Sequence, residues 1–109
     1  MTPQQMEINA EEILLDCIEK GLDHFDRNFK TIVFFSLKTE ENIEKRKIVQ
    51  QPLTFANGLR RMFGVGYVAI EKSIVEEIGR RFGLSVKQQD LVSIISSVRN
   101  SYVTGGGRF

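Results

Sequence analysis

Apolar residues recur along this chain at intervals of three and four positions, which is the spacing of one face of an α-helix. The first helix is predicted to start near residue 10, because Asn9 and Glu12 have the spacing of a capping box. Gly21 and the polar stretch 23–28 favour a break after it, although the apolar pattern could also run on into the next segment. The apolar face of this helix consists of Leu14, Cys17, Ile18, Leu22 and Phe25.

Residues 30–37 are apolar on nearly every face, and their β-branched and aromatic side chains would also suit a strand. A strand needs a partner, and the short apolar runs at 47–50 and 67–70 show neither clean alternation nor a hairpin turn. We therefore predict a helix here, with a strand as the alternative. A small domain can cover only part of such a helix, so the remainder is expected to form the interface of a homodimer. The interface candidates are Val33, Phe34, Phe35 and Leu37.

Proline and glycine mark the boundaries of the next two helices. The polar stretch 38–51 is predicted to be a connecting arm with one short helical turn. Pro52 then suits the first position of a helix that stops at Gly64, and a longer helix is expected between Gly66 and Gly83.

The last helix is predicted to begin after Ser85, which has capping-box spacing with Gln88. The tail 104–109, TGGGRF, is expected to be flexible. Together these segments predict an all-α fold: a single helical domain over residues 1–103, built as a compact bundle of about five helices. A tight Gly-x-Gly corner joins the third and fourth.

The size and cysteine content of the chain restrict its class. A chain of 109 residues is long enough for one domain with its own core. It has no apolar run of the roughly 18 residues that a membrane span needs, and no secretory signal is visible. The single Cys17 cannot form an internal disulfide. We therefore expect a cytoplasmic protein without a membrane partner.

Charge is divided unevenly between the two halves, although the net charge is only +1. Residues 1–46 carry ten acidic and six basic side chains, a net charge of −4, whereas residues 47–109 carry four acidic and nine basic, a net charge of +5. Such an asymmetry could attract a polyanion to the C-terminal half or let two copies meet head to tail. Ordinary solvation of a charged surface is the simpler interpretation.

Residues 64–69, Gly-Val-Gly-Tyr-Val-Ala, satisfy the G-x-G-x-x-A pattern of dinucleotide-binding loops. Such a loop requires a strand before the first glycine, so that loop and helix N-terminus point together at the phosphates. An amphipathic helix precedes Gly64 instead. We interpret Gly64 as a left-handed residue that terminates this helix, and Gly66 as a small residue that lets the next helix start at a sharp angle. No cofactor is predicted.

Catalytic and metal-binding patterns are sparse. His24 lies between Asp23 and Asp26, where a weak metal site is conceivable, but no second His or Cys is at hand to complete it. Cys17 lies on an apolar helix face, where a thiol is inert. We predict no metal, no catalytic residue and no enzymatic activity.

A DNA-binding interpretation arises from residues 78–95. A helix that ends at Gly83, followed by a capped second helix, resembles the turn of a helix-turn-helix motif. Gln89 argues against it, because it stands where that motif packs an apolar residue. Arg80 and Arg81 each follow a glutamate by four residues, which would partly neutralise them. The residues that would contact nucleic acid are Arg80, Arg81, Ser85, Lys87, Gln88, Gln89 and Arg99.

The run Pro52-x-x-Phe55-x-x-x-Leu59-x-x-Met62-Phe63-Gly64-x-Gly66 resembles a pattern of small, all-helical archaeal proteins of unknown function. In that pattern a proline-initiated helix ends in Phe-Gly-x-Gly before a longer helix, and the resemblance extends over about residues 30–84. It implies an all-α fold and a cytoplasmic archaeal protein, and it carries no activity and no functional residue. Tyr67 departs from the pattern, which has a small residue after the second glycine, so packing at that corner could differ.

Two functional hypotheses follow from these patterns. The first is a non-enzymatic, self-associating regulatory or adaptor module that acts through protein contacts, and it needs an exposed apolar patch on residues 33–37. The alternative is a helix-turn-helix protein that reads DNA with the helix after Ser85, and it needs unpaired cations on one face.

Overall fold

The structure, a computed structural model, describes the backbone of residues 3–103 and the side chains of residues 10–101. All regular structure in this range is helical, which confirms the predicted fold class. Two short 3-10 helices flank the third α-helix: η1 (Lys45–Gln50) and η2 (Gly64–Gly66). The five α-helices are α1 (Pro3–Asp23), α2 (Phe29–Glu40), α3 (Pro52–Phe63), α4 (Tyr67–Phe82) and α5 (Leu91–Val103).

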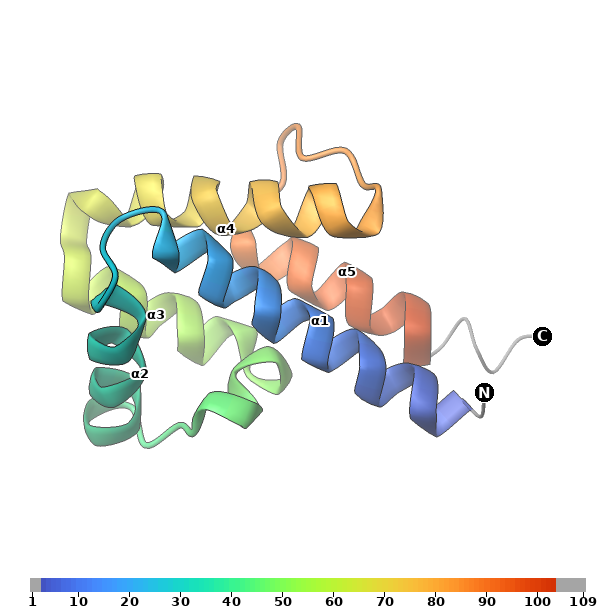
Figure 1. Cartoon of the computed structure of the whole chain (residues 1–109), viewed down its shortest axis with the longest axis horizontal. Coiled ribbons are helices and arrows are strands. Elements are labelled where there is room, and N and C mark those ends of the chain that lie inside the picture. Colours follow the sequence, from blue (N-terminus) through green and yellow to red (C-terminus); the bar gives the residue numbers. More distant parts are fainter. Residues whose placement is uncertain (1–2, 104–109) are drawn as a thin grey trace.

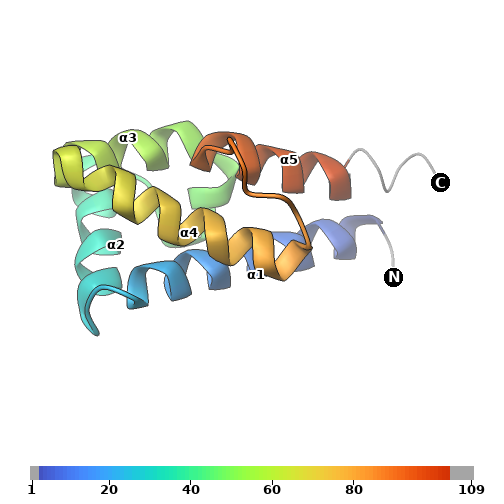
Figure 2. The same cartoon turned by 90° about the horizontal axis from the view of Figure 1, so that it is seen from above.

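Four of the helices run roughly along the long axis of the domain, and α2 lies across one end of them (Figures 1 and 2). The N-terminal end of α1 and the C-terminal end of α5 lie at the opposite end of the bundle (Figure 1). The chain between α4 and α5, residues 83–90, projects from the bundle as a loop (Figure 1). The α2 end and this loop are therefore separate surfaces.

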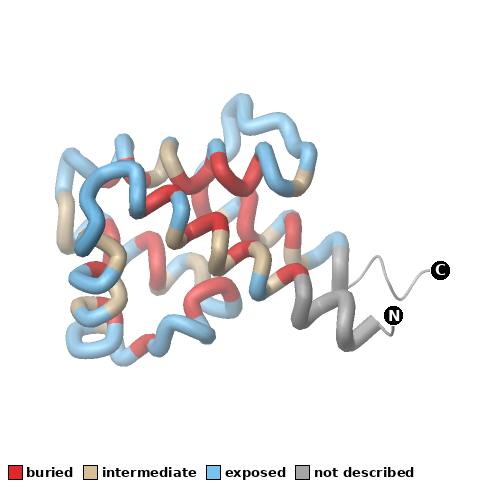
Figure 3. The backbone as a smooth tube through the Cα atoms, in the orientation of Figure 1, coloured by how far each residue is buried: buried red, intermediate tan, exposed pale blue. Residues whose placement is uncertain are grey.

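The core lies where α1 packs against α4 and α5, and buried positions follow the inner faces of these helices (Figure 3). The predicted apolar face of α1 is buried from Leu14 to Leu22, but Phe25 falls beyond the helix end and is exposed. A tightly packed core of this kind supplies most of the stability of a small helical domain. Its largest fully buried side chains include Leu14, Ile18, Leu22, Leu37, Phe55, Leu59, Ile74, Ile78, Leu91 and Ile94.

The predicted start of α1 was wrong, whereas its end falls at the polar stretch 23–28, as expected. The helix begins at Pro3 rather than near residue 10, so Asn9 lies inside it and cannot be its N-cap. Gly21 does not end the helix, which continues to Asp23. Gly21 instead lies where α1 meets α4: a Cβ atom there would be 2.8 Å from Cα of Ile74, and the Ser73 hydroxyl donates a 2.8 Å hydrogen bond to the Gly21 carbonyl oxygen. The close approach of the α1 and α4 backbones explains why position 21 is a glycine.

The predicted break after α1 and the predicted helix over residues 30–37 are both confirmed. A turn follows Asp23, in which the backbone N–H of Asn28 donates a 3.0 Å hydrogen bond to Asp26. The strand alternative for this segment is thereby excluded. Pro52 is the first residue of α3, as expected, because its missing N–H has no partner to lose in the first helical turn.

Glycines behave differently at the two ends of α4. Gly83 adopts the left-handed conformation (φ 65°, ψ 35°) and ends α4 as predicted. Gly64 also has positive φ, 52°, but its ψ of −123° lies outside the left-handed helical region. Gly66 has φ −69° and ψ −14°, which any residue adopts, and a Cβ atom there would meet only Cβ of Phe63 at 3.8 Å. The corner therefore does not require a small residue at position 66.

Candidate functional site

The outward surface of α2 carries two large apolar side chains that the bundle leaves uncovered. Ile32 is 62% exposed and Phe35 is 68% exposed. They are three positions apart, so they are neighbours on one face of the helix. We call this pair the α2 outer face.

Half of the predicted dimer interface lies in the core instead. Val33 and Leu37 are completely buried on the inner side of α2. Phe34 is half-buried and packs against the core, and only Phe35 of the four candidates is exposed. The prediction treated residues 33–37 as one patch, but positions four apart in a helix share a face, so Val33 and Leu37 both point inward while Phe35, between them, points outward. Ile32, which the sequence analysis did not select, is the second exposed member.

A groove adjoins the α2 outer face on its Phe34 side. It has a volume of about 590 Å³ and is open to solvent along one side. Side chains of α1, α2 and the segment 44–46 line it: Leu15, Phe34, Phe35, Lys38, Glu44, Lys45 and Arg46. We call it the α2–η1 groove. It combines an apolar floor with three cations and one carboxylate.

The sequence analysis missed this groove because it treated residues 38–51 only as a polar connecting arm. The arm folds back over α1, where Nζ of Lys45 lies 2.9 Å from a carboxylate oxygen of Glu19. The same ammonium group is 5.2 Å from the centroid of the Phe34 ring, within range of a cation–π contact. The available signal was Lys38 and the Lys45-Arg46 pair, which all follow the apolar segment 29–37, but their proximity depends on the return of the chain.

The helix-turn-helix prediction conflicts with the observed start of α5. Such a motif has a turn of three to four residues, whereas here residues 83–90 separate α4 from α5, and α5 begins at Leu91. Ser85 therefore does not cap a helix, and its hydroxyl is only 3.4 Å from the backbone N–H of Lys87 within the loop. The four predicted contact residues of this region, Ser85, Lys87, Gln88 and Gln89, lie in an exposed loop instead of on a recognition helix.

The actual cap of α5 is Asp90. Its carboxylate accepts a 2.7 Å hydrogen bond from the backbone N–H of Ser93, and this bond lowers the pKa of the carboxyl group. Glu71 of α4 accepts a second bond, 2.9 Å long, from the backbone N–H of Leu91. The Tyr67 hydroxyl donates to the same Glu71 oxygen at 3.0 Å. Two carboxylates thus accept hydrogen bonds from backbone N–H groups in the first turn of α5, where free N–H groups attract negative charge.

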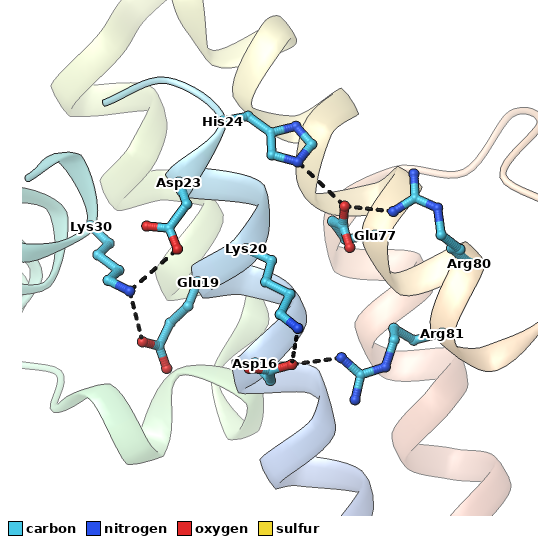
Figure 4. A network of polar contacts seen from close by, with 9 residues as sticks. All are labelled: Asp16, Glu19, Lys20, Asp23, His24, Lys30, Glu77, Arg80 and Arg81. Atoms are coloured by element: carbon cyan, nitrogen blue, oxygen red, sulfur yellow. Dashed lines mark hydrogen bonds and ion pairs between the residues drawn. The ribbon is translucent and has the colours of Figure 1, made fainter. Parts of the chain in front are cut away.

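The arginines expected to contact nucleic acid pair with carboxylates of the same domain, and Figure 4 shows these contacts for Arg80 and Arg81. Arg80 is 2.6 Å from a carboxylate oxygen of Glu77, three residues before it in α4. Arg81 donates a 2.6 Å hydrogen bond to Asp16 of α1, and this bond lowers the pKa of the Asp16 carboxyl group. Arg99 of α5 is likewise paired with Glu11 of α1, at 3.2 Å. The uneven charge of the two halves is therefore partly neutralised between helices, because α1 is the acidic neighbour of α4 and α5.

His24 joins the same polar network and does not form a metal site with the carboxylates beside it. Its Nε2 lies 3.4 Å from a carboxylate oxygen of Glu77, and its Nδ1 lies 3.4 Å from the Ser73 hydroxyl (Figure 4 shows the contact with Glu77). Among the described residues, no group of three or more His, Cys, Asp and Glu side chains could hold a metal ion. His24, just after the end of α1, thus contacts two residues of α4.

Cys17 lies in the core, as predicted from its place on the apolar face of α1. Its side chain is completely buried, and burial raises the pKa of the thiol to about 11. A thiol that stays protonated and has no access to solvent is a poor nucleophile and a poor metal ligand.

No protein-family model matches this chain, and no curated protein or solved structure matches it either. The resemblance to small helical archaeal proteins therefore stays a hypothesis. Within the described part of the chain, each helix is too short or too polar to cross a bilayer. The exposed surface of α2 is consequently the best indication of function.

Proposed function

We propose that this protein is a non-enzymatic regulatory or adaptor module that acts through protein contacts and self-associates through the α2 outer face. One observation carries the proposal: Ile32 and Phe35 are both about two-thirds exposed and adjacent on one helix face. Exposed apolar side chains that are grouped in this way are typical of protein interaction sites. We expect the module to act in the cytoplasm, since its one thiol is free and buried.

A two-fold dimer is the form of self-association that this face favours. In an antiparallel pairing of two α2 helices centred on Phe35, that ring meets its own copy, and Ile32 of each protomer covers the flank of the ring. Thr31 and Thr39 are equally far from Phe35 in sequence, so each would lie opposite the other across the symmetry axis. The pairing places no like charges in direct opposition at its centre.

The strength of this dimer can be bounded from the area that it would cover. Burying the exposed parts of two Ile32 and two Phe35 side chains removes on the order of 500 Å² of apolar surface from water, or about 12 kcal/mol at 25 cal/mol per Å². Association itself costs roughly 4–15 kcal/mol. The two quantities are similar, so the dimer is expected to be weak and to dissociate on dilution.

Light scattering coupled to size-exclusion chromatography, run over a range of protein concentrations, tests the proposal. The wild-type mass should rise toward twice the 12.5 kDa of one chain as concentration increases. Phe35→Glu and Ile32→Lys should each remain folded monomers, because a charge buried at the centre of an interface is costly while one on a free surface is not. Lysine is chosen at position 32 because Lys38 of the other protomer would lie opposite it and repel it. Val68→Glu, which alters an equally exposed apolar residue on α4, should dimerise like the wild type. A wild-type mass near 12.5 kDa at every concentration would reject self-association.

DNA binding, the alternative function, is less well supported. The helix that it requires begins five residues later than predicted, at Leu91, and Arg80, Arg81 and Arg99 are each paired with a carboxylate. No observation on the described residues favours that alternative over protein contacts.

A further inference from the structure

The α2–η1 groove has a cationic rim that the domain itself uses only in part. Lys45 is occupied by Glu19 and by the Phe34 ring. Lys38, by contrast, makes no ion pair with any side chain that the structure describes, and it lies on the exposed side of α2. The Arg46 side chain is 78% exposed and reaches only one carboxylate, that of the exposed Glu44, at 3.5 Å. Two cations beside an apolar floor are therefore available to a ligand.

The floor and the surroundings of the groove restrict what this ligand can be. Leu15 and Phe34 are half-buried and Phe35 is exposed, so the floor offers apolar surface of both aliphatic and aromatic character. Beyond Arg46 the surface continues into a second depression, where two carboxylates, Glu11 and Glu12, are balanced by two cations, Arg46 and Lys47. The excess of positive charge is therefore on the Lys38 side of Arg46, in the α2–η1 groove.

We infer that the α2–η1 groove binds an acidic amphipathic helix of another protein. Its apolar stripe lies on Leu15, Phe34 and Phe35, and carboxylates on its flanks pair with Lys38 and Arg46. An amphipathic helix commonly binds another protein by laying its apolar face into a hydrophobic groove. Because the groove is open along one side, it would leave much of a small molecule exposed, whereas ligand pockets for small molecules bury most of their ligand.

This inference goes beyond self-association and can fail separately from it. The two surfaces lie on opposite flanks of Phe35, with Ile32 on the side of the α2 outer face and Lys38 on the side of the groove. Because Phe35 borders both surfaces, its variants cannot tell them apart. In the antiparallel pairing proposed above, Lys38 lies three residues after Phe35 and therefore opposite Ile32 of the other protomer, so its variants can affect both surfaces. Ile32→Lys therefore reports on self-association, and charge reversal at Arg46 reports on the groove alone.

The test is a titration of the isotopically labelled full chain with a synthetic amphipathic helix, followed by two-dimensional amide NMR. The probe carries a Leu-rich stripe flanked by glutamates, and a matched peptide has glutamine in place of every glutamate. The acidic peptide should shift the resonances of Leu15, Phe34 and Lys38, and should bind more tightly than the glutamine peptide. Added salt should weaken its binding, since the rim charges are exposed to solvent.

Charge-reversal variants make the test specific. Lys38→Glu and Arg46→Glu should each weaken binding of the acidic peptide by about threefold to tenfold, the range expected when an exposed ion pair is replaced by repulsion. Lys72→Glu on α4 changes the net charge equally but lies outside the groove, and it should leave the affinity within about twofold.

Several outcomes would overturn the inference. Equal binding of the acidic and glutamine peptides would do so, and so would shifts confined to another surface or an equal effect of Lys72→Glu. Dodecanoate or a single-stranded oligonucleotide that shifts the groove resonances when the acidic peptide does not would assign the groove to a different ligand class. If Arg46→Glu alone converted a wild-type dimer into a monomer, the occupant would be a second copy of this chain.

Discussion

Substituting alanine for Gly21 tests the central packing contact of the fold. The added Cβ atom would lie 2.8 Å from both Cα and Cγ1 of Ile74 and 3.1 Å from its backbone nitrogen. Optimal separation between non-bonded carbon atoms is about 3.5–4.0 Å, so α1 and α4 would have to move apart by up to about 1 Å there. The side chain of Ile74 could rotate away, but its Cα atom and backbone nitrogen could not.

The expected magnitude combines two opposing effects. Overpacking a well-packed site typically costs about 1–3 kcal/mol, and the hydrogen bond from Ser73 to the Gly21 carbonyl oxygen would be disturbed as well. Alanine has a better helix propensity than glycine by up to about 1 kcal/mol in a helix interior. That gain is reduced here, because Gly21 lies in the last turn of α1. We expect Gly21→Ala to lower the free energy of unfolding by about 1–2 kcal/mol.

Urea denaturation followed by circular dichroism measures this change, and thermal melting should show a fall of about 4–8 °C per kcal/mol for a domain of this size. Gly66→Ala is the matched control. Its backbone has ordinary helical angles and its new Cβ atom has room, so it should be neutral or slightly stabilising. A Gly21→Ala variant as stable as the wild type would refute the close approach of α1 and α4 at this point.

Three further predictions concern the corner, the cap of α5 and the buried thiol. Gly64→Val should destabilise the fold by about 1–3 kcal/mol, because a β-branched residue is strained at φ 52° although its side chain has room. NAD or ATP should not change the melting temperature of the wild type. A clear rise with either would support the dinucleotide-loop interpretation. Asp90→Ala should cost about 1 kcal/mol. Because the pKa of the Asp90 carboxyl group is lowered in the folded state, the stability that its carboxylate contributes is present above pH 3.8, the ordinary pKa, and is lost as pH falls through the folded-state pKa. Asp90→Asn keeps a hydrogen-bond acceptor and should lose less stability on acidification. An acid dependence equal to that of the wild type would contradict the cap. Cys17, with its thiol pKa raised to about 11, should react with a thiol reagent only as fast as the domain opens, and rapid labelling of the native protein would show that it is accessible.

Local sequence patterns predicted which segments are helical and where most of the helices end. Pro52 and Gly83 act through their own backbone preferences, and a stripe such as Ile70, Ile74 and Ile78 needs only the helical period to be recognised. Boundaries that depend on a side-chain cap were less secure. Ser85 and Gln88 have a valid capping spacing, but Asp90 caps α5, because the helix starts where its first turn can also reach Glu71.

The tertiary structure alone decided which residues share a surface. Residues 33–37 look uniform in sequence, yet Val33 and Leu37 are in the core and Phe35 is in water, because α2 lies across the end of the bundle. Likewise, the acidic and basic halves of the chain suggested a charged surface, but Asp16 pairs with Arg81 across 65 positions of sequence. Helical periodicity is a local property that each segment carries with it. Burial, ion pairing and the α2–η1 groove depend on how distant segments pack together, and no single segment encodes that arrangement.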